Sequence, residues 1–201
     1  MTRKIAKMSL KAKFIQESLK LFSLKGFESS SIHDILGAVK ASRGGFYCHF
    51  ASKEDLFHEV LKEARGIWRE RNLTGLDQVE TSLQKLKKQL ENYCNRYLLD
   101  ADNFPGGCIF VKFAVELGDL RPHLAQEVHK GFIGLKKMIN RLLTDGQAAG
   151  ELPDNVDPDL VTEILFNGML GASINYNADK SVQNLRRSIN ALIDYLEKLI
   201  S

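Results

Sequence analysis

The chain has 201 residues, 44% hydrophobic and 26% charged, which is typical of a soluble globular protein and excludes a fibrous or disordered one. No apolar run approaches the roughly 20 residues that span a membrane, and the basic N-terminus leads into no apolar signal segment, so we expect a cytoplasmic protein without membrane contact. Three cysteines without Cys-x-x-Cys or His/Cys spacing predict neither a metal site nor a structural disulfide.

The net charge of +3 is unevenly distributed along the chain. Residues 1–55 hold ten Lys and Arg against five Asp and Glu, whereas the remainder holds 18 basic and 20 acidic residues. A basic end on a slightly acidic body is typical of a protein that places one end on a polyanion such as DNA. Arg3, Lys4 and Lys7 could form an arm that reaches a DNA groove, or simply a solvated tail.

Helix start and stop patterns divide the first part of the chain. The first expected helix runs from about Ser9 to Lys25 and ends at Gly26, where we expect a left-handed cap. The second begins near Ile32, because Ser31 and Asp34 form a Ser-x-x-Asp capping pattern. Its apolar face packs on the first helix, so a small helical domain is predicted here.

Two further serines cap the next helices. Ser42 precedes a short third helix that carries Arg43 to His49, and Ser52 precedes a fourth, much longer helix from Lys53. Two short helices joined by a tight turn form the helix-turn-helix arrangement, whose second helix lies in the DNA major groove. Residues 1–52 are therefore predicted to be a three-helix DNA-binding domain.

The composition of the short helix at residues 43–49 favours contact with DNA. Gly44 and Gly45 cost about 1 kcal/mol each relative to alanine in a helix, but they would let the backbone approach base pairs. Arg43 is long enough to reach guanine O6 and N7. The alternative is that the glycines form a loop and Tyr47 to Phe50 an aromatic core. The predicted DNA-binding residues are Ser30, Ser31, Ser42, Arg43, Gly44, Gly45, Tyr47, His49 and Lys53.

An ordered pattern fills the first sixty residues: Gly26-Phe27, then Ser30-Ser31-Ile32-x-Asp34-Ile35, then Ala41-Ser42-Arg43-Gly44-Gly45-Phe46-Tyr47-x-His49-Phe50-x-Ser52-Lys53-Glu54-x-Leu56. It resembles the motif of TetR-family transcriptional regulators. The resemblance implies an all-α homodimer with an N-terminal DNA-binding domain and a C-terminal domain that binds an effector and dimerises. Family members often have Thr or Ala at Gly45 and a polar or basic residue at Cys48, so the operator sequence cannot be carried over.

Residues 53–201 are expected to form the effector-binding and dimerisation domain, which brings the total to about nine helices. In the family resemblance, its last two helices pair with those of a partner in a four-helix interface; the alternative is that they close the monomer's own core. The predicted interface residues are Leu160, Ile164, Gly168, Gly171, Leu185, Ile189, Leu192 and Leu196.

Aromatic and sulfur-containing side chains in the second domain suit an apolar or flat effector. The predicted pocket residues are Trp68, Tyr93, Tyr97, Cys108, Phe113, Phe166 and Met169. Cys108 follows Gly106-Gly107 at an expected helix N-terminus, where the helix dipole can lower a thiol pKa. Its surroundings also resemble a segment of TetR-family regulators that respond to electrophiles or oxidants, so Cys108 is either a sensor or an inert buried thiol.

These features together predict a ligand-responsive DNA-binding regulator, specifically a repressor that binds a palindromic operator as a homodimer and is released by a small molecule or an electrophile. The chain has no nucleophile elbow, phosphate loop or metal-ligand spacing, so we predict no enzyme activity and no cofactor. A helical adaptor that binds another protein without DNA is the alternative, but it assigns no role to Arg43, Gly44 and Gly45.

Overall fold

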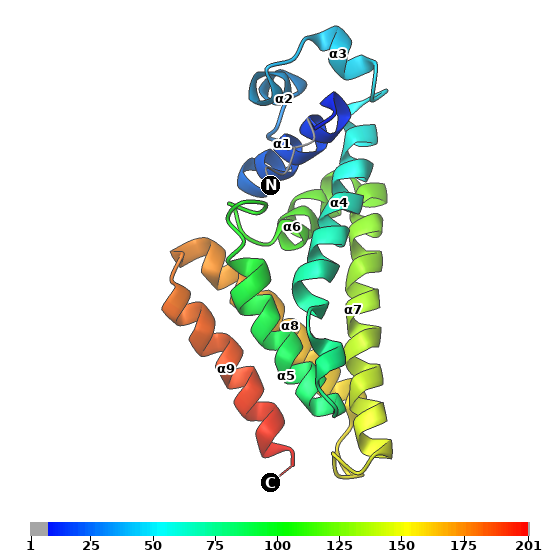
Figure 1. Cartoon of the computed structure of the whole chain (residues 1–201), viewed down its shortest axis with the longest axis vertical. Coiled ribbons are helices and arrows are strands. Elements are labelled where there is room, and N and C mark those ends of the chain that lie inside the picture. Colours follow the sequence, from blue (N-terminus) through cyan, green and yellow to red (C-terminus); the bar gives the residue numbers. More distant parts are fainter. Residues whose placement is uncertain (1–7, 201) are drawn as a thin grey trace, which may run out of the picture.

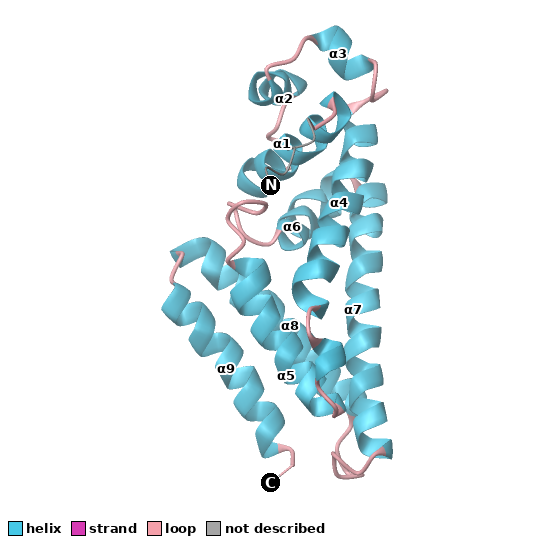
Figure 2. Ribbon diagram, viewed as in Figure 1, coloured by secondary structure: helices cyan, strands magenta, loops and turns pink. Residues whose placement is uncertain are grey.

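The computed structural model describes residues 8–200, which form nine α-helices, two short helical segments and no strand (Figures 1 and 2). The α-helices are α1 (Leu10–Lys25), α2 (Ile32–Val39), α3 (Arg43–Tyr47), α4 (Lys53–Leu73), α5 (Ser82–Asn92), α6 (Ile109–Leu120), α7 (Pro122–Ala148), α8 (Pro158–Asp179) and α9 (Val182–Lys198). The all-α prediction is confirmed. The basic residues Arg3, Lys4 and Lys7 lie outside the described residues.

Serine side chains cap the four N-terminal helices, and capping patterns predicted the last three of these starts. Ser9, Ser31, Ser42 and Ser52 each accept a hydrogen bond from the backbone amide three residues on. The helix that follows Ser42 is shorter than predicted, because it ends at Tyr47 and leaves His49 in the turn that follows it. The capping patterns therefore predicted the helix starts accurately, whereas the predicted end of the helix after Ser42 was two residues too late.

Gly26 ends α1, but not in the predicted left-handed helical conformation. Its φ of 88° is combined with an extended ψ of 172°. The reason lies in α6, where the carboxylate of Glu116 accepts the amide N–H groups of Phe27 (2.7 Å) and Glu28 (2.9 Å). A Cβ atom on Gly26 would lie 2.5 Å from that carboxylate, so the backbone is shaped by a tertiary contact.

An aromatic core joins the N-terminal helices to the second domain. Phe14 packs edge-on against Phe46 and Phe50, with ring centroids 5.5 and 5.9 Å away. Phe113 on α6 packs against Phe57 of α4 at 4.9 Å and is fully buried. Phe113 was predicted to line a pocket, and that prediction is wrong because its ring fills the core between α4 and α6.

Helix α4 runs from the small N-terminal bundle into the lower bundle in Figure 1, where α5, α7, α8 and α9 pack around one another. It contacts α1 near one end and α5 and the π-helical segment Tyr93–Leu98 (η2) near the other. A boundary at residue 52 stays a prediction, since one rigid helix belongs to both cores. Within residues 8–200, no helix combines the length and apolar character needed to cross a membrane.

The last two helices, α8 and α9, pack against each other within the monomer (Figure 1). Leu185, Ile189 and Leu196 of α9 are buried in this chain's own core, so their assignment to a dimer interface is wrong. A Cβ atom on Gly168 would lie 2.6 Å from a methyl group of Leu192, which shows that this pair serves the α8–α9 contact. Periodicity identified an apolar face on α9 but could not show which helix covers it.

Candidate DNA-binding surface and ligand cavity

Helix α3 is held by one face and exposed on the other. Phe46 and Phe50 are buried against Phe14, whereas Arg43 and Tyr47 point outward, and Tyr47 is 46% exposed. The guanidinium of Arg43 lies 5.8 Å from the centroid of the Tyr47 ring, and within the described residues it has no carboxylate partner. In Figure 1, α3 lies at the end of the molecule, away from the second domain.

The two glycines of α3 have no explanation within the chain itself. A Cβ atom on Gly44 would meet only the Ser42 hydroxyl at 3.9 Å, and one on Gly45 would meet the same hydroxyl at 3.5 Å and Leu10 at 3.6 Å. Both are ordinary contact distances, so neither position is forced to be glycine by packing. A smooth, exposed helix surface of this kind suits close approach by an external partner such as a base-pair edge.

The serines predicted to bind DNA have different environments. Ser31 and Ser42 are exposed, although both hydroxyls cap helices, and Ser31 also bonds to the carboxylate of Asp34. Ser30 is fully buried and its hydroxyl donates to the carbonyl of Gly26 at 2.6 Å. The assignment of Ser30 to the DNA surface is therefore wrong, and this side chain instead stabilises the turn before α2.

Lys53, which was also predicted to bind DNA, makes contacts within the chain. Its ammonium donates to the carbonyls of Phe27 (2.9 Å) and Ser30 (3.1 Å) and lies 4.2 Å from the Phe27 ring centroid. Burial lowers the pKa of Lys53, despite the attraction of Glu28. Lys53 thus ties the start of α4 to the α1–α2 turn through two of the three N–H donors of its ammonium, and its contact with a DNA phosphate stays a prediction.

A cavity of about 470 Å³ opens between α4 and α7 in the second domain. Its lining is mostly apolar and aromatic, and consists of Arg65, Trp68, Arg69, Leu73, Tyr93, Cys108, Phe110, Lys130, Gly131, Phe132, Gly134, Leu135, Met138 and Leu170. This size and composition fit a small organic ligand. Of the predicted pocket residues, Trp68, Tyr93 and Cys108 lie on its wall.

The other predicted pocket residues lie elsewhere. Tyr97 is fully buried behind the cavity wall, where its hydroxyl lies 3.4 Å from the sulfur of Cys108. Met169 is buried and contributes a backbone carbonyl that accepts from the Tyr93 hydroxyl at 3.3 Å. Phe166 packs on the ring of Phe132 rather than on the cavity. Aromatic content located the region, but it could not separate the wall from the core behind it.

Several wall residues were missed because they are polar or very small. Gly131 and Gly134 lie three residues apart on α7, and a Cβ atom on either would meet open space. The three cations of the wall, Arg65, Arg69 and Lys130, appear in the sequence as an ordinary solvated helix face. These three side chains come together because α4 packs beside α7. The hydrogen bond from Arg65 on α4 to the carbonyl of Glu127 on α7, at 2.5 Å, is one contact between the two helices.

Cys108 precedes α6 as its N-cap residue, as predicted, but burial opposes ionisation of its thiol. Burial raises the pKa of Cys108, and this effect exceeds the opposing hydrogen bonds from Tyr97 and from backbone amides of the first turn. The first turn of the helix therefore lowers this pKa, as expected, but burial outweighs it. The side chain is only 4% exposed, so it meets the outside of the molecule through the cavity alone.

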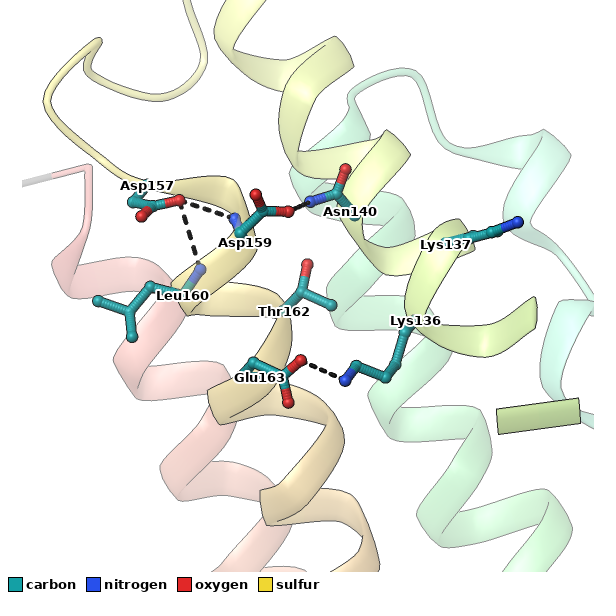
Figure 3. A pocket seen from close by; sticks show the side chains of 8 residues that line it. All are labelled: Lys136, Lys137, Asn140, Asp157, Asp159, Leu160, Thr162 and Glu163. Carbon is teal, nitrogen blue, oxygen red and sulfur yellow. Dashed lines mark hydrogen bonds and ion pairs between the residues drawn. The ribbon is translucent and has the colours of Figure 1, made fainter. Parts of the chain in front are cut away.

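A second depression lies between α7 and α8, and most of its side chains are polar or charged (Figure 3). Lys136 forms an ion pair with Glu163, and the amide of Asn140 donates to Asp159 at 2.7 Å. Asp157 caps α8 by accepting from the amide of Asp159 at 2.9 Å. Because these groups bond to one another, the depression is a weaker candidate for an organic ligand than the cavity between α4 and α7.

Two family models match the chain: "Bacterial regulatory proteins, tetR family" over residues 14–60 and "Tetracyclin repressor-like, C-terminal domain" over residues 82–192. The HTH-type transcriptional repressor DhaR of Mycobacterium sp. (strain GP1) is 23% identical over 192 residues, 96% of this chain and 94% of that protein. A TetR transcriptional regulator from Chloroflexus aurantiacus J-10-fl has a TM-score of 0.87 and 26% identity, over 95% of this chain and 96% of that one. CifR, a TetR family regulator solved as a cysteine mutant with 26-bp operator DNA, has a TM-score of 0.82 and 19% identity, over 96% and 98% of the chains.

The fold and the exposed α3 define a helix-turn-helix DNA-binding protein with a ligand-sized cavity in a second helical domain. The chain belongs to the TetR family of bacterial regulatory proteins, because the C-terminal model alone matches more than half of its 201 residues. It is a DNA-binding transcriptional regulator, and the family resemblance drawn from the motif at residues 26–56 is confirmed.

Proposed function

We propose that this regulator is a repressor that binds a two-fold symmetric operator as a homodimer and releases it when a small molecule occupies the cavity between α4 and α7. The DNA-contacting residues are Ser31, Ser42, Arg43, Gly44, Gly45, Tyr47 and His49. The observation that carries the proposal is the exposure of α3, with Arg43 and Tyr47 outward while Phe46 anchors the helix. A single short helix touches few base pairs, so two copies must act together.

The outward face of α8 is the proposed dimer interface. Leu160, Ile164 and Ile174 are exposed apolar side chains at helical spacing, and Leu160 is 59% and Ile174 51% exposed. Gly171 lies on the same stripe, and a Cβ atom there would meet open space within the chain. An apolar stripe with a small residue at its centre lets two helices approach closely, and a two-fold dimer would cover it with the same stripe of the partner.

Helix α6 is the proposed link between the cavity and the DNA-binding domain. At its start, Cys108 lies on the cavity wall, and near its end Glu116 holds the backbone of Phe27 and Glu28. A ligand that shifts α6 would therefore move the α1–α2 turn and change the separation of the two α3 helices in the dimer. Differential binding of ~1–3 kcal/mol between the two arrangements is sufficient for release.

A gel-shift assay with DNA from the protein's own promoter, at several salt concentrations, tests the proposal. We expect binding that weakens steeply with salt and keeps a preference for one palindromic sequence. Binding without sequence preference, or no binding at low salt, would contradict it. Cys108→Ser tests an electrophile signal in the same assay, since unchanged release by quinones, aldehydes and peroxide would exclude Cys108 as the sensor.

A further inference from the structure

The cavity between α4 and α7 has a cationic mouth. Arg65 and Arg69 lie one turn apart on α4, and Lys130 faces them from α7. Among the described residues that line the cavity, none is Asp or Glu. Lys130 pairs with Glu127 at 2.5 Å and Arg65 donates to the Glu127 carbonyl, whereas Arg69 is exposed and makes no hydrogen bond or ion pair with any described residue.

The interior of the same cavity has the opposite character. Trp68, Phe110 and Met138 contribute apolar surface, and the most buried lining residues are Tyr93 and Cys108, both nearly inaccessible to solvent. Burial keeps these two groups uncharged, because it raises the pKa of both. Polarity therefore changes along the cavity, from three cations at the solvent end, of which Arg69 has no partner among the described residues, to neutral, apolar surface at the closed end.

We propose that the ligand of this cavity is an amphipathic organic anion, with a carboxylate at Arg69 and an apolar body that extends past Trp68 toward Cys108. Arg69 supplies a charge-assisted hydrogen bond, and Arg65 and Lys130 add to the positive potential at the mouth. A neutral ligand of the same shape fills the apolar part but leaves Arg69 without a partner. The carboxylate is thus the feature that this cavity selects, and its effect on DNA binding rests on the function proposed above.

Trp68 provides the measurement, since it is the only tryptophan in the chain and it lines the cavity. Titration of the full-length protein with decanoate and with decanol, followed by Trp68 fluorescence, compares an anion with a more apolar neutral analogue of equal chain length. We expect decanoate to bind about tenfold more tightly than decanol, a difference of about 1.4 kcal/mol. An apolar cavity without charge selection would favour decanol, and equal or tighter binding of decanol would overturn the proposal.

Two charge-reversal variants on α4 test whether Arg69 at the cavity mouth causes the preference for decanoate. We expect Arg69→Glu to weaken decanoate binding about tenfold and to leave decanol binding unchanged. Lys62→Glu is the matched control, because Lys62 is exposed on the same helix but does not line the cavity. Loss of decanoate affinity in both variants, or in neither, would overturn the assignment to Arg69. Circular dichroism of both variants checks that each is folded.

The same ligands separate this inference from the proposed function. If decanoate binds with the expected selectivity and the gel shift with promoter DNA is unchanged, the ligand class stands and the proposed release mechanism is wrong. If decanoate shows no selective binding while another compound releases the DNA, the release mechanism stands and the ligand class proposed here is wrong.

Discussion

At the scale of single residues, the contact of Glu116 with the α1–α2 turn explains why position 26 is a glycine. The carboxylate accepts two backbone N–H groups, of Phe27 and Glu28, and it occupies the space that a side chain at position 26 would need. Two charge-assisted bonds to backbone amides are among the stronger contacts a half-buried carboxylate can make. The turn before the DNA-binding helices is thereby fixed from the second domain.

Gly26→Ala should therefore destabilise the protein by ~1–3 kcal/mol, because it combines a positive φ with a Cβ atom 2.5 Å from Glu116. Urea unfolding measures the change. Gly37→Ala is the control in the same small domain, since a Cβ atom there meets open space in the middle of α2, and it should stabilise by roughly 0.5–1 kcal/mol. A neutral Gly26→Ala variant would show that the Glu116 contact does not fix this turn.

The cysteines should differ in reactivity according to their burial. The folded-state pKa of Cys108 lies above its usual value of 9.0. The thiol therefore stays protonated in the folded protein at a pH where the same thiol is already ionised in the unfolded chain. The stability due to this group is therefore present below about pH 9 and is lost as the pH rises through the folded-state pKa. Iodoacetamide at neutral pH should label exposed Cys48 first, and Cys108 should react only at higher pH.

Mass spectrometry of the labelled peptides checks this order, and labelling in urea, where all three cysteines are accessible, is the control. Cys94 is buried as well, and burial raises its pKa, so it should follow the slow pattern of Cys108. Rapid labelling of Cys108 at neutral pH would contradict the raised pKa. It would also favour the electrophile-sensor hypothesis over an inert thiol.

At the scale of elements, Arg43 on α3 and Lys53 at the start of α4 have different proposed roles. Arg43 contacts DNA, whereas Lys53 stabilises the fold. Arg43→Ala removes an exposed side chain with no carboxylate partner among the described residues, so it should change unfolding free energy by less than about 0.5 kcal/mol. In the gel shift it should weaken operator binding by ~1–3 kcal/mol. Lys53→Ala should instead lower stability by about 1–2 kcal/mol, because the carbonyls of Phe27 and Ser30 lose their donor.

Chemical unfolding of the two variants, together with the gel shift, tests this division. If Arg43→Ala unfolds the protein, or if it leaves operator affinity unchanged, α3 is not the recognition helix. If Lys53→Ala weakens DNA binding without any loss of stability, Lys53 does contact a phosphate and its assignment to the fold is wrong.

The helix starts were predictable because capping is local, as with Ser31 and Asp34 only three residues apart. Ser30 was misassigned because its hydroxyl bonds to the carbonyl of Gly26 within the α1–α2 turn, a contact that the Ser-Ser pattern does not reveal. The contacts of Lys53 with this turn could not be predicted, because its partners become near neighbours only when α4 packs on the turn. The cavity was predictable as a region, but Arg69 could not be assigned to it, since a cation on a helix face has the same pattern whether it faces water or a ligand.

At the scale of the whole molecule, the chain places its two proposed binding surfaces toward opposite ends of α4. The cavity lies beside the second half of α4, and the DNA-binding helices lie beyond its first turn (Figure 1). Phe113 joins the two regions because it packs on both Phe57 of α4 and Phe22 of α1. Close-packed interiors transmit strain, so we expect a shift of α6 to move α1 and α4 together.

The proposed dimer gives the last prediction. Ile174→Asp places a charge on the exposed apolar stripe of α8, where pairing with a partner would bury it, so it should convert the dimer into a monomer of 22.6 kDa. Light scattering after size exclusion at micromolar concentration measures the mass. Val115→Asp is the control, since Val115 is also apolar and exposed but lies on α6. Because two half-sites bind together, the Ile174 variant should also lose operator affinity without unfolding, and a monomeric parent protein would contradict the whole arrangement.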